Sequence, residues 1–393
     1  MHRLRPGDRR RGRAAVETRA HKALVAGFIV LGAIDGVWVA RLPALKHKLS
    51  LDSGRLGIVI FAVSAVATLS LPFAGWLASR RGSRGPAGGG LLLASGALAA
   101  AAFVPSFAPL LVVACGLGSG VGIADVSLNA HGVELERRTG RHLLSPLHAA
   151  WSFGLLGGSA VTAVSAAVGL GLRAELPAVA AALVVITLVA TPRLLAGTGA
   201  GVDTAHFALP RGALALPAVL MFCAFFVESA AMSWSAVFLS GPVGASAAVG
   251  AGAVVAYAAA MGVARLFGDR LLVRWGFGGL ARRSGTVTCI GTLLAIIPRS
   301  TVPALVGFAL VGIGCAAIVP ALFRIGAAMP GISQSAGVAA VATAGYTGGL
   351  LNGPTIGFVA RGVGLSAALG LLVVAGAVIV VLGPRLQESA APT

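Results

Sequence analysis

The chain has 393 residues, of which 57% are hydrophobic and only 11% are charged, and its formal net charge is +18. A soluble globular protein is typically about 25% charged, so this composition excludes a water-exposed surface of such a size. The apolar residues form continuous runs with short polar breaks along nearly the whole chain, which favours membrane-spanning helices over one buried core or a barrel. Because the basic residues lie between these runs, membrane topology explains them better than nucleic-acid binding does.

Twelve apolar segments are long enough to cross a membrane, since a spanning helix needs about 20 residues. We predict an all-α polytopic membrane protein whose helices form two sets of six. The first set is expected at 23–41, 54–78, 86–104, 108–133, 146–170 and 174–192. The second set is expected at 213–240, 245–266, 282–298, 302–324, 334–360 and 364–383.

The segment from Thr191 to Arg211 is the longest polar, glycine-containing interruption within the chain, and we interpret it as the connection between two halves. A cleaved signal peptide is disfavoured, because the first apolar run is long and carries Asp35. The predicted division is a basic cytoplasmic tail (1–22), an N-terminal six-helix bundle (23–193), a cytoplasmic linker (194–212), a C-terminal six-helix bundle (213–385) and a second cytoplasmic tail (386–393).

The distribution of lysine and arginine predicts the orientation. With the N-terminus inside, 23 basic residues fall on inner segments and seven on outer segments. Cytoplasmic loops of membrane proteins carry an excess of these residues. The split therefore supports an even number of crossings in the cytoplasmic (inner) membrane, with both termini in the cytoplasm. Four of the seven outer residues, Arg41, Lys46, Lys48 and Arg55, gather in the first outer segment and are the exception.

The two halves repeat each other at a nearly constant offset. The matched pairs, 193 to 196 residues apart, are Arg80-Arg81-Gly82 with Arg274-Trp275-Gly276, Gly116-Leu117-Gly118 with Gly312-Ile313-Gly314, Gly154 with Gly348, and Asp35 with Glu228. Glycine is abundant here, with 56 residues, so one match alone carries little weight. Four matches at nearly one offset indicate a parallel repeat of six helices.

Three acids, Asp35, Asp125 and Glu228, lie within apolar segments. A carboxylate at mid-membrane costs roughly 2.5–3.5 kcal/mol on insertion scales, and such residues usually face the bundle interior or a water-filled cavity. Asp125 shares one helix face with Asn129 and with Gly122. We expect the three acids on a substrate or proton pathway, although an acid that only pairs within the fold is the alternative for each.

Five further side chains could contribute to this pathway, each with a structural alternative. Trp38 and Trp234 could stack on a solute or simply pack, and packing is favoured for Trp234 because it does not share the face of Glu228. His148 could exchange protons or bond to a neighbouring inner loop. Tyr346 and Asn352 lie in a run rich in glycine and proline, which could serve as a hinge without touching a solute.

The residues after the second span resemble the signature of the major facilitator superfamily. The stretch runs from Gly75 to Arg84, and Ser79 and Ser83 replace the acid and the base that the family usually has. The resemblance covers residues 23–385 and implies an inner-loop gating motif made of Gly75, Arg80, Gly82 and Arg84, with Arg274 and Gly276 in the second half.

Within that superfamily, the chain is most similar to the fucose-permease-like branch. The similarity lies in the stretches 35–43, 125–138, 148–154, 228–239 and 345–357. In fucose–proton symporters, acids on the first and fourth helices carry substrate and proton roles, and Asp35 and Asp125 fall on those helices.

The expected function is secondary transport of a small polar solute, such as a sugar, by alternating access and proton symport. A proton-coupled exporter of drugs or metabolites is the alternative, and a membrane-embedded sensor or enzyme is disfavoured because no P-loop or nucleophile motif is present. The expected partners are the solute, protons and the lipid bilayer, with no nucleic acid, and the protein is expected to be a monomer. We expect no cofactor and no metal, since the four cysteines lack metal-ligand spacing.

The charge distribution generates a topological prediction. Reporter fusions placed at Met1 and at Thr393 should both read as cytoplasmic, because an even number of crossings returns the chain to its starting side. A fluorescent reporter that matures only in the cytoplasm and a phosphatase active only outside provide matched readouts. One terminus on the outer face would contradict the twelve-span topology.

Overall fold

The computed structural model of the chain describes residues 6–141, 143–196 and 211–388, and these residues form helices joined by short turns and loops, with no strand among them. The first group of helices is α1 (Pro6–Lys48), α2 (Ser53–Arg81), α3 (Arg84–Ala101), α4 (Phe107–Thr139), α5 (Leu144–Ala167) and α6 (Leu172–Ala190). The second group is α7 (Ala215–Ser240), α8 (Ala247–Arg265), α9 (Gly268–Ile296), α10 (Thr301–Cys315), α11 (Ile318–Ala327), α12 (Gln334–Val363) and α13 (Leu365–Glu388). Short 3-10 turns, η1 (Thr191–Arg193) and η2 (Gly212–Leu214), flank the predicted linker, most of which lies outside the described residues.

The predicted all-α membrane fold is confirmed, with twelve crossings when α10 and α11 are counted as one. In the described part of the chain, nine segments are long and apolar enough to cross a membrane on their own, and one of them is the combined segment Thr301–Ala327. The predicted span 302–324 divides at Ala316 and Ala317, one turn before Pro320, whose ring nitrogen has no N–H to donate to the Ala316 carbonyl oxygen.

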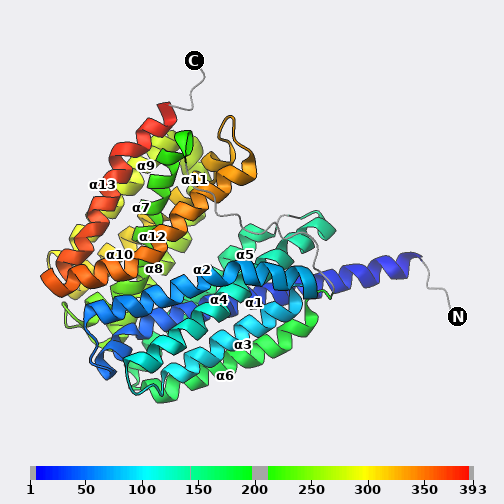
Figure 1. Cartoon of the computed structure of the whole chain (residues 1–393), viewed down its shortest axis with the longest axis horizontal. Coiled ribbons are helices and arrows are strands. Elements are labelled where there is room, and N and C mark those ends of the chain that lie inside the picture. Colours follow the sequence, from blue (N-terminus) through cyan, green and yellow to red (C-terminus); the bar gives the residue numbers. More distant parts are fainter. Residues whose placement is uncertain (1–5, 142, 197–210, 389–393) are drawn as a thin grey trace.

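Two predicted boundaries are corrected. The helix α1 begins at Pro6, so the expected tail continues the first span as a helix that extends beyond the bundle (Figure 1). The predicted span 282–298 is the later part of α9, which starts at Gly268 and bends sharply at Gly276. Gly276 has φ 63° and ψ 174°, close to the φ 77° and ψ 159° of Gly82 at the end of α2.

The two helix groups share the same close helix contacts, which supports the internal repeat. A Cβ on Gly154 would lie 2.2 Å from the carbonyl oxygen of Ile29, and a Cβ on Gly348 would lie 2.2 Å from that of Phe222. The partners in these contacts are 193 and 194 residues apart. Backbones that approach so closely leave room only for glycine.

A second pair of contacts corrects one predicted match. Gly118 packs on the carbonyl of Val63, where a Cβ would lie at 2.3 Å, and Gly312 packs on that of Tyr257, where a Cβ would lie at 2.5 Å. Gly118 therefore corresponds to Gly312, at an offset of 194 residues, and the sequence match at 196 residues was two positions out of register.

The groups meet at one end and diverge toward the ends that carry the chain termini (Figure 1). At the meeting end, Gly57 of α2 packs on Gly353 of α12, where a Cβ would lie 2.3 Å from the Gly353 oxygen. Nearby, Arg361 lies 3.8 Å from Asp52, which caps α2. The backbone N–H of Arg55 donates to Asp52 at 2.7 Å and, with Arg361, holds the pKa of that carboxyl below its ordinary value.

A buried ion pair ties α1 to α6 in the first group. Arg41 is 5% exposed and pairs with Glu175, which also accepts a hydrogen bond of 2.7 Å from Thr162 of α5. Arg41 donates to the carbonyl oxygen of Leu170 at 2.9 Å as well. Arg41 is therefore a structural residue inside the bundle, and it does not count as a loop charge in the topology argument.

The ion pair predicts a large effect of Glu175→Gln on stability. Removing one partner leaves a buried, uncompensated arginine, so the free energy of unfolding should fall by about 3–5 kcal/mol. The matched control is Glu134→Gln, which breaks the surface pair of Glu134 with Arg138 and should cost less than about 1 kcal/mol. Denaturant unfolding of the purified protein measures both, and equal effects would contradict the structural role of Glu175.

Candidate solute-binding cavity

A cavity of about 300 Å³ lies between the two helix groups. Its walls come from α1, α2, α4 and α5 on one side and from α7 and α12 on the other. The lining residues are Leu31, Asp35, Ser64, Ala67, Thr68, Leu71, Val121, Gly122, Asp125, Trp151, Phe225, Ser229, Tyr346, Gly349 and Leu350. Three of the predicted pathway residues, Asp35, Asp125 and Tyr346, are therefore brought together.

Asp35 is held in the cavity wall by α5. The indole Nε1 of Trp151 donates a hydrogen bond of 3.0 Å to Asp35 Oδ2. The two helices can bring these side chains together because Gly32 faces the backbone of Trp151, where a Cβ would lie 2.0 Å from the carbonyl oxygen. Asp35 thus has a neutral donor, which fixes the carboxyl without neutralising it.

Asp125 has a neutral donor of its own, on the helix face predicted from the sequence. Asn129 Nδ2 donates to Asp125 Oδ1 at 3.0 Å and to the Asp125 carbonyl oxygen at 2.9 Å. One turn before, Gly122 packs on α2, where a Cβ would lie 2.4 Å from the oxygen of Ala67. This close packing places Asp125 at the cavity wall, while Asn129 itself is outside the lining and orients the carboxyl.

The second helix group contributes aromatic and hydroxyl groups. The ring of Phe225 on α7 contacts Tyr346 on α12 edge to face, with centroids 6.0 Å apart. Ser229 lies one turn after Phe225, so both face the cavity from the same side of α7. This wall offers stacking surfaces and hydrogen-bonding groups without formal charge.

Glu228 was expected on the same pathway, but the structure separates it from the other two acids. Its carboxylate forms an ion pair of 3.1 Å with Arg265 of α8, and its carbonyl oxygen accepts a bond of 3.2 Å from Tyr257. Adjacent residues on a helix point about 100° apart, so Ser229 faces the cavity while Glu228 turns toward α8. Glu228 therefore belongs to a half-buried polar cluster within the second group.

Four other predicted pathway residues do not line the cavity. Trp38 is 5% exposed and Trp234 is fully buried, so both pack in the core. Asn352 is also buried and donates to the carbonyl oxygen of Gly349. His148 is exposed on α5, edge to face with Phe28 at 5.7 Å, and lies close enough to Asp125 to act on its charge.

The predicted inner-loop motif occupies helix ends on the side of the molecule that carries the termini. Gly75 is buried in α2, Gly82 ends that helix, and Arg84 opens α3. Arg80 lies over the Trp76 ring, 4.9 Å from its centroid, whereas Arg274 is exposed beside Gly276. Ser83, which replaces the family's base, is buried and lies 2.9 Å from Nδ1 of His131.

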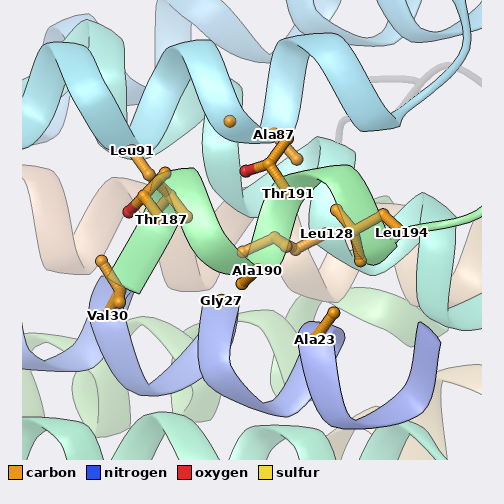
Figure 2. Close-up of a pocket in the computed structure, with 11 residues that line it drawn as sticks. Ala23, Gly27, Val30, Ala87, Leu91, Leu128, Thr187, Ala190, Thr191 and Leu194 are labelled. Carbon is orange, nitrogen blue, oxygen red and sulfur yellow. The ribbon is translucent and has the colours of Figure 1, made fainter. Parts of the chain in front are cut away.

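A second, much smaller crevice lies within the first helix group, between α1, α3, α4 and α6 (Figure 2). It encloses about 10 Å³ and is lined by small apolar side chains such as Ala23, Val30 and Ala190. A space of this size holds at most a single water molecule. It is therefore a packing gap and not a binding site.

The sequence reasoning missed Trp151, Ser64, Thr68, Phe225 and Ser229. A usable signal existed for Trp151. Glycines spaced four apart occur on both helices, at 32 and 36 on α1 and at 154 and 158 on α5, and this spacing predicts a close helix contact. Trp151 precedes Gly154 by one turn, so that contact would have placed it against α1. The serines and Thr68 carry no comparable signal.

No profile of a known protein family matches the chain. Three individual proteins are similar to it over most of its length. The chain is 30% identical to an uncharacterised MFS-type transporter of Yersinia pestis, over 87% of this chain and 89% of the relative. It is 28% identical to an uncharacterised transporter of Sinorhizobium fredii over 93% of this chain and 98% of the relative. It is 27% identical to the membrane protein MosC of Rhizobium meliloti, over 90% of this chain and 86% of the relative.

Solved structures of low sequence identity share the fold. A D-xylose–proton symporter aligns with a TM-score of 0.75 at 13% identity, covering 94% of this chain and 97% of that one. A point mutant of the nucleoside transporter NupG aligns with a TM-score of 0.74 at 15% identity, covering 95% of this chain and 100% of that one. A bacterial homologue of the human lysosomal transporter Spinster, in an inward-facing and occupied conformation, aligns with a TM-score of 0.71 at 15% identity, covering 94% of this chain and 96% of that one.

The cavity predicts which positions on α7 are open to water. In a background with the four native cysteines replaced by alanine, Ser229→Cys should react with a hydrophilic methanethiosulfonate reagent, because Ser229 lines the cavity. Ser235→Cys, on the same helix but fully buried, is the matched control and should remain unmodified. Mass spectrometry measures the modified fraction, and equal modification at the two positions would contradict the cavity.

Proposed function

The chain belongs to the major facilitator superfamily, and we propose that this secondary transporter moves a small polar solute across the cytoplasmic membrane by alternating access, coupled to the proton gradient. Two of the relatives are described as transporters, and the structural neighbours are transporters and not enzymes. The solute, the coupling and the site residues are the parts that we propose. The observation that carries the proposal is the cavity between the two halves, with Asp35 and Asp125 in its wall.

The arrangement of the halves supports alternating access. The cavity takes its walls from both groups, so a rocking of one group against the other would change its access. At the far end the halves are held together by the Gly57–Gly353 contact and by Asp52 with Arg361. If the termini are cytoplasmic, as the charge distribution predicts, this conformation is closed to the outside and open toward the cytoplasm.

The two carboxyls support coupling to protons. An ionisable residue within a membrane-spanning segment is by default a candidate for an ion or substrate pathway. Asp35 and Asp125 each have a neutral donor, Trp151 and Asn129 respectively, and both reach the cavity. A proton that binds on one side of the membrane and leaves on the other would be carried through these groups.

The lining supports a solute that is small and hydroxylated, such as a sugar. Ser64, Thr68 and Ser229 offer hydroxyls, and Trp151 and Tyr346 offer aromatic faces for a ring to stack on. About 300 Å³ is at the low end of ligand cavities, which favours a sugar-sized solute over a large aromatic drug. The proposed sugar class agrees with the resemblance to the fucose-permease-like branch.

The proposed location, oligomeric state and domain boundaries rest on the sequence patterns described above. We place the protein in the cytoplasmic membrane as a monomer with both termini inside. The two helix groups are its two domains, with proposed boundaries at 23–193 and 213–385, and the residues after 193 connect them. Export instead of import by the same cavity is the second candidate, since a carrier that alternates access runs in whichever direction its gradients drive it.

Asp125→Asn tests the coupling. The substitution preserves the shape of the side chain but removes its titration. A solute identified by thermal stabilisation in a panel of sugars, amino acids and small amines is offered to reconstituted vesicles with an imposed pH gradient. The variant should lose gradient-driven accumulation and retain exchange of labelled for unlabelled solute, because exchange needs only a loaded carrier that reorients.

Two outcomes would contradict this role of Asp125. Accumulation equal to that of the parent protein would mean that Asp125 is not the coupling residue, and Asp35 would be the next candidate. A loss of both activities together with a lower melting temperature would mean that Asp125 only ties α4 into the bundle. Asp269→Asn is the matched control, since it makes the same substitution in an exposed acid outside the cavity.

A further inference from the structure

We propose that the solute of this cavity carries a positive charge, so that the site takes a small hydroxylated organic amine in competition with protons. The inference rests on the proposed transport function and names the substrate class of the same cavity. It follows from the charges around the cavity and not from any one residue.

The cavity wall holds two carboxyls and no basic side chain among the described residues. The two carboxyls face each other across the cavity, Trp151 lies at Asp35, and Asn129, His148 and the Tyr346 hydroxyl of α12 lie near Asp125. Trp151 and Asn129 are neutral donors, so they orient a carboxylate but leave its charge in place. His148 is a basic neighbour of Asp125 but lies outside the cavity lining.

The third acid, Glu228, differs from Asp35 and Asp125 because an arginine compensates its charge. Glu228 is 3.1 Å from Arg265 and belongs to a closed ion pair away from the cavity. Asp35 and Asp125 are half-buried at the cavity wall and have no such partner within the described chain, although a charge in an apolar setting is normally paired. The missing partner is supplied by a proton or by a cationic solute.

The remaining lining suits an organic cation better than a metal ion. Trp151, Phe225 and Tyr346 offer aromatic faces, which attract ammonium groups as well as sugar rings. Ser64, Thr68 and Ser229 can accept and donate hydrogen bonds to hydroxyls. An anionic solute is disfavoured, since it would meet two carboxyls and no fixed positive charge.

The site predicts that the cation and the proton exclude each other. A protonated carboxyl no longer attracts an ammonium group, and a bound ammonium group disfavours protonation of the same carboxyl. Binding of the amine should therefore release protons, and a carrier with this property exchanges the amine for protons.

The experiment compares ligands of one size and three charges. D-glucosamine, D-glucose and D-glucuronate, together with a panel of other small amines and their neutral isosteres, are titrated into the purified full-length protein. Thermal shift and isothermal calorimetry are the readouts. The tightest-binding amine should bind at least about tenfold more tightly than its neutral isostere at pH 8, because only the amine adds the Coulomb attraction between an ammonium group and a carboxylate. Its affinity should fall by up to about tenfold for each unit of decreasing pH where one proton is displaced.

The variants test whether the charge preference comes from the cavity. Asp35→Asn and Asp125→Asn should reduce the preference for the amine over its isostere, and Asp269→Asn should leave it unchanged. A His148→Gln variant should keep the preference, because His148 lies outside the cavity lining.

Each remaining outcome overturns the proposal. It fails if a neutral sugar binds as tightly as its amine, if an anion binds best, or if no amine in the panel stabilises the protein. It also fails if Asp269→Asn changes the preference for the amine as much as Asp35→Asn does. A neutral sugar that binds and is carried with protons would overturn the cation alone and leave the proposed transport function standing. Amines that bind but are never carried in vesicles would instead count against the transport function.

Discussion

The close packing of α1 on α5 is the contact on which the cavity depends. Gly32 and Gly36 face the carbonyl oxygens of Trp151 and Leu155, while Gly154 and Gly158 face those of Ile29 and Ala33. Each helix supplies small residues at the points where the other backbone passes, so the contact has no room for a side chain in either direction. This proximity is what lets the Trp151 indole reach the carboxyl of Asp35.

The second half repeats this backbone arrangement but uses it differently. Gly348 packs on Phe222 as Gly154 packs on Ile29, so α12 on α7 is the counterpart of α5 on α1. At the 194-residue offset, however, Trp151 corresponds to Gly345 and Leu71 corresponds to Arg265. Glu228, the counterpart of Asp35, therefore lacks an indole donor and finds an arginine instead. One backbone repeat thus yields an open carboxyl in one half and a closed ion pair in the other.

These differences explain what could be predicted from the sequence. Continuous apolar runs specify crossings, so the fold class and the count of twelve followed directly from composition and length. The helix termini were harder, because Pro320 interrupts a span while α1 continues far into a basic segment. The acids Asp35 and Asp125 were identifiable because charge in apolar helices is rare.

Glu228 met the same criterion, but its partner Arg265 lies at the end of another helix. Only the packing of α7 on α8 shows that the charge of Glu228 is neutralised. Ser64 and Ser229 line the cavity only because of which way their helices turn, and hydroxyls are too common in such helices to mark a site.

The charge of the cavity and the motion of the halves constrain each other. Asp35 and Asp125 belong to the first half of the molecule. The second half contributes only uncharged side chains to the cavity, namely Phe225, Ser229 and Tyr346. When the halves reorient, these uncharged side chains would therefore cover the two acids. On the proposed mechanism, an occluded state with both carboxyls ionised would hold uncompensated charge away from water, which costs several kcal/mol per ion. A proton or a bound cation removes most of that cost, so the protonated and the loaded carrier reorient while the empty ionised carrier does not. Coupling then arises from the electrostatics of closure, and it needs no separate relay between a proton site and a solute site.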